Sequence, residues 1–214
     1  MLCIAFAWLL FSLPTIATSE NCYNSSALPI DLEEYADYLV KLVSDARISL
    51  VSDSRKRLTH QLTLDTIKLQ NMGDIVETGV FKGGTAAIIL KTLINFDQCQ
   101  RRFWAFDSFE GLPVPSRKDM DGTLKVGNPG AFAVTEERFI ANMKRLKVWD
   151  PRVHVVKGWF KDTVARAPIS HIGFLRLDGD LYESTQVREK LNLLRKNNLP
   201  TNLNRASWML STQR

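Results

Sequence analysis

The chain has 214 residues, 45% of them hydrophobic and 24% charged, so it can form one domain with a sizeable core and is not of the intrinsically disordered class. Its 28 lysines and arginines exceed its 23 acidic residues, which gives a formal net charge of +5. These basic residues are scattered, and the densest run, Arg55-Lys56-Arg57, has no interleaved aromatic residues, so we expect a solvated helix face there and no nucleic-acid binding.

The first 19 residues differ in composition from the rest of the chain. Residues 1–11 are nearly all apolar, and residues 13–19 end in Ala17-Thr18-Ser19. The apolar run is too short to span a bilayer comfortably, but its length suits a signal-peptide core, even without a charged residue before it. The other interpretation is a buried N-terminal strand or helix. We predict a signal peptide at residues 1–19, a protein of the secretory pathway or a secreted one, and no stable membrane span after the leader is cleaved.

Two further features agree with export. Asn24-Ser25-Ser26 is an N-glycosylation sequon, which has meaning only for a chain that enters the secretory pathway. Of the three cysteines, Cys3 lies in the predicted leader, so Cys22 and Cys99 remain in the mature chain. These two could form a disulfide between the N-terminal arm and the loop before the second strand, or remain as partly buried free thiols. The sequence does not choose between the two states.

A helical segment is expected at residues 20–72, before the first strand. Pro29 and Asp31 are signals for the start of a helix, after which apolar residues recur at helical spacing: Leu32, Tyr35, Leu39, Leu42 and Val43. A second helix is expected over residues 58–69. Neither helix has chemistry that the sequence identifies, and we expect them to cover one face of the sheet or part of a substrate entrance.

A glycine turn between a strand and a helix is the centre of the sequence. The apolar residues around Ile75 and Val76 predict a strand that leads through Glu77 into a turn with Gly79, Gly83 and Gly84, and a buried helix follows over residues 84–96. Glycines let the backbone approach a ligand closely, and the start of a helix offers unpaired N–H groups. The arrangement is typical of α/β proteins that bind a nucleotide-like cofactor.

Strands and helices alternate through the rest of the chain. The sequence predicts further strands at 102–107, 152–158 and 171–178, and further helices at 135–146, 159–166 and 184–196. The connection over 108–130 is a long irregular loop, of the kind that usually bears on function. This alternation predicts an α/β fold with a doubly wound parallel sheet, a Rossmann-like domain that occupies residues 73–196.

Each predicted strand ends in residues suited to a ligand site. In chain order these are Glu77 and Gly79, then Asp107, then Gly158, then Asp178 and Asp180. Any single acid of this kind is more often a helix cap or a loop carboxylate, but four strand ends agree. Because ligands of such sheets bind beyond the carboxyl ends of the strands, we expect these side chains to share one site.

The spacing of the glycines indicates which ligand class to expect. A dinucleotide fold uses G-x-G-x-x-G, whereas this turn reads E-x-G-x-x-x-G-G, which disfavours a nicotinamide-dependent oxidoreductase. An acid two residues before the first glycine repels phosphate and suits a cationic ligand. S-adenosylmethionine fits, since it has a ribose, a sulfonium and an amino acid but no phosphate. Asp107 is placed to accept hydrogen bonds from its ribose.

Four stretches, residues 75–84, 106–113, 157–163 and 175–185, together resemble the macrocin O-methyltransferase (TylF-type) family of metal-dependent methyltransferases. The similarity extends over about residues 74–194 and matches the N-terminal helices only loosely. The resemblance implies methyl transfer from S-adenosylmethionine to a hydroxyl of a sugar or other small polyhydroxylated acceptor, with Mg²⁺ holding the acceptor.

The resemblance also implies roles for individual residues. The residues expected to bind the cofactor are Glu77, Thr78, Gly79, Gly83, Asp107, Ser108, Gly158 and, near the adenine, Asp162. Asp178 is expected to be a metal ligand and also the base that takes the hydroxyl proton. Asp180 is expected to lie next to the metal ligands without binding the metal itself. Neither the acceptor nor homo-oligomer formation can be decided from the sequence.

The end of the chain departs from the family. The family has a further acidic pair of metal ligands at the end of strand five, but the last acidic residue here is Glu189, and residues 197–214 form an atypical tail. We expect a sheet that is incomplete after strand four, because Trp208-Met209-Leu210 is too short to replace the next strand. Two hypotheses follow: an incomplete copy of an O-methyltransferase, or a catalytically inactive isoform that acts as a binding protein.

Overall fold

The computed structural model describes residues 22–24, 26, 31–69, 73–115 and 128–178, together with the backbone of residues 208–210. These residues contain one parallel sheet whose strands are β1 (Asp74–Thr78), β2 (Phe103–Asp107), β3 (Val153–Lys157), β4 (Ile172–Leu177) and β5 (Trp208–Leu210). Their order in the sheet is β3-β2-β1-β4-β5. The chain builds outward from β1 through β2 to β3 and then returns to place β4 on the other side of β1, which confirms the doubly wound parallel sheet.

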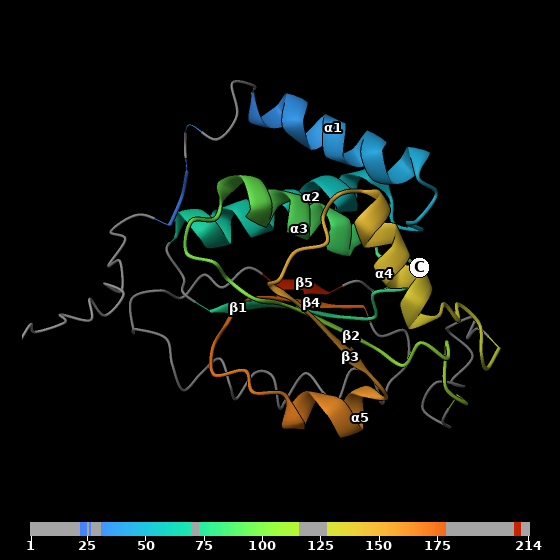
Figure 1. Cartoon of the computed structure of the whole chain (residues 1–214). Helices are drawn as coiled ribbons and strands as arrows, with labels where there is room; N and C mark the ends of the chain where they lie inside the picture. The colour runs from blue at the N-terminus through green and yellow to red at the C-terminus, as the bar shows by residue number, and fades with distance from the viewer. Residues whose placement is uncertain are drawn as a thin grey trace, which may run out of the picture.

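Helices lie on both faces of the sheet (Figure 1). They are α1 (Leu32–Asp45), α2 (Asp53–Lys68), α3 (Gly84–Phe96), α4 (Glu136–Arg145) and α5 (Phe160–Thr163), the last followed by a 3₁₀ turn, η2 (Val164–Arg166). The first three stack above one face, and α5 lies below the other (Figure 1). The predicted helix at 184–196, the predicted leader at 1–19 and Asp180 lie outside the described residues.

The fifth strand corrects one expectation. We expected Trp208-Met209-Leu210 to be too short to occupy the place beside the fourth strand, and this was wrong. The segment lies there as β5, parallel to β4, with Leu175 opposite Trp208 and Leu177 opposite Leu210. An open apolar strand edge presents a row of unpaired N–H and C=O groups, so even a short extended segment finds partners along it.

Sequence signals place the helix starts well where a capping residue is present. The Asp31 carboxylate accepts hydrogen bonds from the N–H groups of Glu33 and Glu34 at the start of α1, and Thr135 caps α4 in the same way. The second helix begins at Asp53 rather than at the predicted residue 58. Its first turns are polar and therefore show no hydrophobic periodicity.

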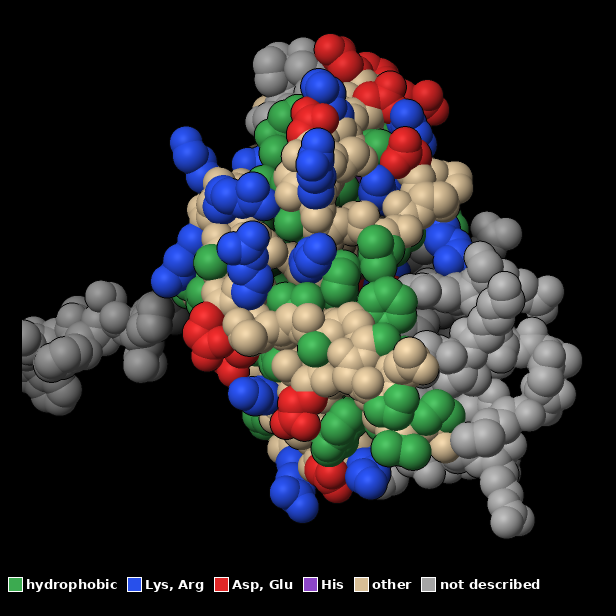
Figure 2. Space-filling view, turned by 90° about the vertical axis from the view of Figure 1, so that its right-hand side faces the viewer, with side chains coloured by type: hydrophobic (Ala, Val, Ile, Leu, Met, Phe, Trp, Pro, Cys, Tyr) green, Lys and Arg blue, Asp and Glu red, His purple; other side chains and the backbone are tan. Residues whose placement is uncertain are grey.

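The basic run at the start of α2 is only partly a solvated face. Arg57 is exposed and pairs with Asp37, as expected for a surface arginine. Lys56 is instead buried, and its ammonium donates to Asp53 and to Ser44, each at 2.8 Å. The expectation for Lys56 was wrong because these two oxygens satisfy the ammonium beneath α1. In the view of Figure 2, basic side chains lie mainly in the upper half of the face, with acidic ones among them, and hydrophobic side chains gather toward the lower right. None of the described helices is long and apolar enough to cross a membrane.

The N-terminal arm is attached covalently to the end of α3. Cys22 and Cys99 form a disulfide with their Cα atoms 5.1 Å apart. Beside it, Tyr23 makes an antiparallel bridge with Asp97, and the Gln98 N–H donates to the Cys22 carbonyl. Of the two states that the sequence left open for these cysteines, the structure has the disulfide.

A buried histidine joins α2 to α3. The His60 ring lies against Tyr35 and Phe96, and its Nδ1 is 2.9 Å from the Thr92 hydroxyl. That hydroxyl already donates to the Ile88 carbonyl, so Nδ1 is the donor and Nε2 has no partner among the described residues. Burial, with a smaller effect of Lys68, lowers the pKa of His60 from 6.5 to about 4.

We predict that replacing both Cys22 and Cys99 with serine lowers the free energy of unfolding by about 2–4 kcal/mol. The disulfide joins positions 77 residues apart, so its loss frees a long loop in the unfolded chain. Urea denaturation of the double variant and of the parent measures the difference. The parent with reductant should lose a similar amount, and equal urea midpoints for parent and variant would contradict the prediction.

We predict that acid destabilises the fold through His60. The imidazole is neutral in both states at pH 7.5, but below about pH 6.5 the unfolded chain takes up a proton that the folded chain binds only near pH 4. The free energy of unfolding should therefore fall by about 3 kcal/mol across this window. His60→Asn keeps a donor for Thr92 but cannot titrate, so its urea stability should depend less on pH. An identical pH dependence in parent and variant would contradict the assignment.

Candidate functional site

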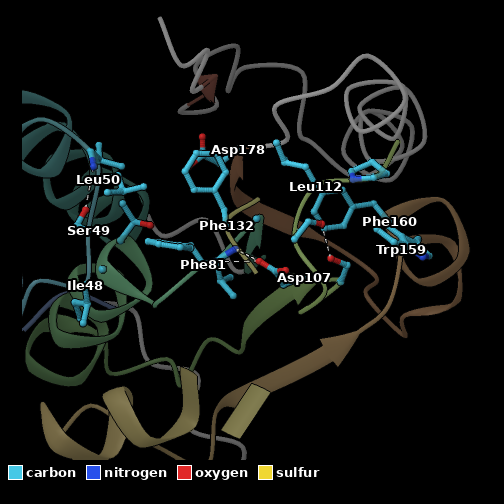
Figure 3. A pocket seen from close by; sticks show the side chains of 18 of the residues that line it. Ile48, Ser49, Leu50, Phe81, Asp107, Leu112, Phe132, Trp159, Phe160 and Asp178 are labelled. Carbon is cyan, nitrogen blue, oxygen red and sulfur yellow. Dashed lines mark hydrogen bonds between the residues drawn. The ribbon is translucent and has the colours of Figure 1, made fainter. Parts of the chain in front are cut away.

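A cavity of about 200 Å³ lies at the carboxyl edge of the sheet, where the chain changes direction between β1 and β4. The connections after β1, β2, β3 and β4 all contribute to its lining. A fifth wall comes from Ile48 to Val51, the connection between α1 and α2 (Figure 3). Of the two expectations for the N-terminal helices, the structure shows the first, since α1 and α2 lie above one face of the sheet, and the loop between them lines the cavity.

Steric constraints fix the glycine turn after β1. Gly79 has φ +82°, and its N–H donates to the Phe106 carbonyl at 2.8 Å. A Cβ on Gly79 would lie 2.4 Å from the carbonyl oxygen of Asp178, so only glycine lets the ends of β1 and β4 approach this closely. Gly83, at the start of α3, has φ +90° and faces Met143 and Phe139 of α4 instead of the cavity.

Asp107 binds the loops together at the end of β2. Its Oδ2 accepts hydrogen bonds from the N–H groups of Val80 at 2.9 Å and Phe81 at 3.0 Å, and its Oδ1 accepts from Phe109 at 2.9 Å. Burial raises the pKa of Asp107, and these backbone donors oppose that rise. The carboxylate lines the cavity, as expected, but most of its hydrogen-bonding capacity orders the glycine turn.

A buried ion cluster lies beneath the turn. Arg176 of β4 donates through Nη1 to Glu77 Oε1 at 2.7 Å and through Nη2 to Asp178 Oδ2 at 2.8 Å. Glu77 and Arg176 are both fully buried, and the Thr85 hydroxyl also donates to Glu77 Oε1. Burial raises the pKa of Glu77, an effect that Arg176 and Thr85 oppose. For Arg176, burial works against the charged form, but the two carboxylates raise its pKa overall.

Both carboxylates of the cluster keep one oxygen without a partner. Glu77 Oε2 and Asp178 Oδ1 are buried and make no hydrogen bond to any described residue. Two carboxylates and one guanidinium leave the cluster one positive charge short of neutrality. Unpaired acceptors and excess negative charge in a buried place favour a cationic ligand.

Apolar side chains form the cavity walls. On one side lie Ile48 and Leu50, and on the other Leu112, Trp159 and Phe160 (Figure 3). Between them the rings of Phe81 and Phe132 meet edge to face, with centroids 6.0 Å apart. The cavity therefore combines apolar walls with an acidic end at Asp178, an arrangement that suits a flat, partly polar ligand.

The predicted cofactor residues fall into three groups. Those that line the cavity are Gly79, Asp107 and Ser108, and Asp178, the predicted metal ligand and base, lines it with them. Glu77 and Thr78 are buried beneath it. Gly83, Gly158 and Asp162 do not line it: Gly158 is held by the Asp107 carbonyl and packs against Thr163, and Asp162 is exposed on α5.

Sequence reasoning missed Arg176, the 48–51 wall and Phe132. Arg176 had a usable signal, since it is a lone charge in the apolar run Phe174-Leu175-Arg176-Leu177 of a predicted strand. The 48–51 wall and Phe132 had none, because apolar loop residues look alike until the fold places them beside the glycine turn.

A metal site is not complete within the described residues. They contain no group of three or more His, Cys, Asp or Glu side chains that could hold a metal ion. Asp178 Oδ1 is a free oxygen ligand of the hard type that Mg²⁺ prefers, whereas Oδ2 is occupied by Arg176. Among the described residues, Asp178 Oδ1 thus provides one of the several oxygen ligands that a Mg²⁺ site needs.

Comparison with known proteins gives the family. Residues 45–197 match the family model of the macrocin-O-methyltransferases (TylF). The chain belongs to this family. The match includes the α1–α2 connection, the glycine turn and the whole acidic cluster, so the cavity lies inside the shared TylF domain.

Individual relatives agree with the family. Demethyldecarbamoylnovobiocin O-methyltransferase of Streptomyces niveus is 36% identical over 64% of this chain and 53% of its own length. 8-Demethyl-8-(2,3-dimethoxy-alpha-L-rhamnosyl)-tetracenomycin-C 4'-O-methyltransferase of Streptomyces olivaceus is 40% identical over 61% of this chain and 52% of its own length. Among solved structures, the O-methyltransferase NovP superposes with a TM-score of 0.62 at 28% identity, covering 75% of this chain and 78% of that one. The chain spans about half the length of these curated relatives.

Proposed function

We propose that the protein is an S-adenosylmethionine-dependent O-methyltransferase that acts on a hydroxyl of a sugar or other small polyhydroxylated acceptor. The acidic cluster carries this proposal, because Glu77 Oε2 and Asp178 Oδ1 are buried, unpaired and next to the glycine turn of a TylF family member. A phosphate-bearing dinucleotide would meet repulsion here. A ligand with an ammonium and a sulfonium group would supply the missing positive charge.

The described residues offer a partner for each part of this cofactor. Asp178 would hold the ammonium group, with the negative charge of Glu77 beneath it, and the first N–H groups of α3 would hold the carboxylate of the cofactor. Asp107, through the remaining capacity of Oδ1, and Ser108 would bind the ribose. The apolar wall of Leu112, Trp159 and Phe160 would cover the adenine. When bound, the cofactor supplies a methyl group activated by positively charged sulfur.

Asp178 is the residue placed to act on the acceptor. One of its oxygens, Oδ2, is fixed by Arg176. A carboxylate oxygen has two lone pairs, so beside its contact with the ammonium group Oδ1 would have one left to accept the hydroxyl proton or to hold Mg²⁺ beside the acceptor oxygen. The apolar walls exclude water and orient the acceptor, which matters because methyl transfer depends mainly on alignment with the methyl carbon. The two curated relatives are named as O-methyltransferases of demethyldecarbamoylnovobiocin and of a rhamnosyl-tetracenomycin-C, and the rhamnosyl group in the second name supports a glycosylated acceptor.

We expect the parent chain to bind S-adenosylhomocysteine, the demethylated cofactor, in calorimetric titration. Glu77→Gln should weaken binding about tenfold because it removes negative charge beneath the ammonium site. The matched control, Glu137→Gln, changes an exposed acid of α4 and should bind like the parent. A folded parent chain that shows no binding would contradict the proposed function.

Methyl transfer is tested separately with S-adenosylmethionine labelled in its methyl group and a panel of glycosides, with Mg²⁺ and with chelator. Labelled product that requires Mg²⁺ would support the metal-assisted reaction. Binding of the cofactor without transfer to any glycoside would favour the alternative, a non-catalytic binding protein.

We also propose that the protein enters the secretory pathway. The Cys22–Cys99 disulfide supports this, because disulfides persist mainly in oxidising compartments. The sequon beside it forms a local turn, in which the Asn24 side-chain oxygen accepts hydrogen bonds from the Ser26 N–H at 3.2 Å and hydroxyl at 3.1 Å.

In eukaryotic expression, we expect the product to lose residues 1–19 and to shift in gel mobility after treatment with peptide-N-glycosidase. Asn24→Gln should remove the shift and leave cleavage of the leader unchanged. A product that retains Met1 and has no glycan would contradict the proposed location.

A further inference from the structure

Arg176 is a fully buried arginine within an apolar strand. It lies on β4 directly opposite Glu77 of β1, while its neighbours Leu175 and Leu177 pack into the core on the other face of the sheet. Arginine is almost never fully buried unless it is paired, because removing a guanidinium from water is costly. The position of Arg176 therefore calls for an explanation beyond the packing of β4.

The two contacts of Arg176 use the shape of the guanidinium. One terminal nitrogen reaches Glu77 Oε1 at 2.7 Å and the other reaches Asp178 Oδ2 at 2.8 Å. Only a planar fork offers two donors in fixed directions, whereas a lysine ammonium is a single compact charge. Arg176 thus joins an acid of β1 to the acid that follows β4, across the point where the chain changes direction.

Stability alone gives a poor reason for this arrangement. Replacing a buried ion network by well-packed apolar residues is often neutral or stabilising. Arg176 Nε is buried and has no partner among the described residues. What the arginine does is specific, because it occupies one oxygen of each acid and leaves the other without a hydrogen-bond partner, in Asp178 at the cavity and in Glu77 beneath it.

We propose that Arg176 is a positioning residue that fixes the carboxylates of Glu77 and Asp178, so that Asp178 Oδ1 receives the cationic group of the ligand at the cavity and the negative charge of Glu77 stabilises that group from beneath. This inference rests on the proposed function, since it concerns how the same cavity holds the cofactor. Without the fork, the two carboxylates repel each other, and each is free to rotate toward other donors. The ligand then meets carboxylates that keep their negative charge but no longer have the orientation that suits its cationic group.

Two variants test this role. Arg176→Lys keeps the positive charge but cannot span both acids, and Arg176→Gln keeps polarity without charge. We expect Arg176→Lys to retain most of the thermal stability of the parent, yet to bind S-adenosylhomocysteine at least about tenfold more weakly. Arg176→Gln should lose both stability and binding. Calorimetry and thermal unfolding of the same preparations provide the two readouts.

The matched control is Arg101→Lys. Arg101 is also a buried arginine paired with an acid, Asp97, but it lies away from the cavity. This control should lose stability without losing affinity for S-adenosylhomocysteine. If Arg176→Lys matched the parent in both thermal stability and affinity for S-adenosylhomocysteine, the proposal would be overturned. It would also be overturned if neither Arg176 variant folded, because a role in stability would then explain the arginine. Absence of binding by the parent would instead contradict the proposed function itself.

Discussion

The structure depends on the close approach of the ends of β1 and β4. Their parallel pairing places Glu77 opposite Arg176, and the missing side chain of Gly79 makes room for the Asp178 carbonyl. Any larger residue at position 79 would separate the strand ends and with them the buried acids. The glycine turn therefore fixes the spacing of the charged groups as well as shaping a loop for a ligand.

From this contact the remaining features of the cavity follow. Asp107 orders the turn from β2 by accepting two of its backbone hydrogen bonds, from Val80 and Phe81, and α3 begins where the turn ends. The acidic end lies near the strand ends, while the apolar walls come from connections more distant in the sequence. A ligand with a cationic end and a flat, less polar end matches this division, which is the physical basis for proposing S-adenosylmethionine as the ligand of the cavity.

Much of the fold could be predicted from local patterns. Apolar runs, capping residues and the glycine turn indicated the strands, α1, α3 and the parallel sheet. The acids at the strand ends correctly indicated that the cavity lies at the carboxyl edge of the sheet. Pairings between distant residues left weaker signals. The Lys56 contacts with Ser44, the burial of Arg176 and the place of β5 beside β4 depend on which elements become neighbours. The role of a glycine was also ambiguous in the sequence, because Gly79 lines the cavity whereas Gly83 makes room for Met143 and Phe139 of α4.

The most direct test of the proposed site is a crystal structure of the protein with S-adenosylhomocysteine. We expect the ligand in the cavity, with its amino group within hydrogen-bond distance of the Asp178 or Glu77 carboxylate and its ribose beside Asp107. A ligand bound elsewhere, or one whose amino group points away from both acids, would contradict the assignment of the acidic cluster to the cofactor.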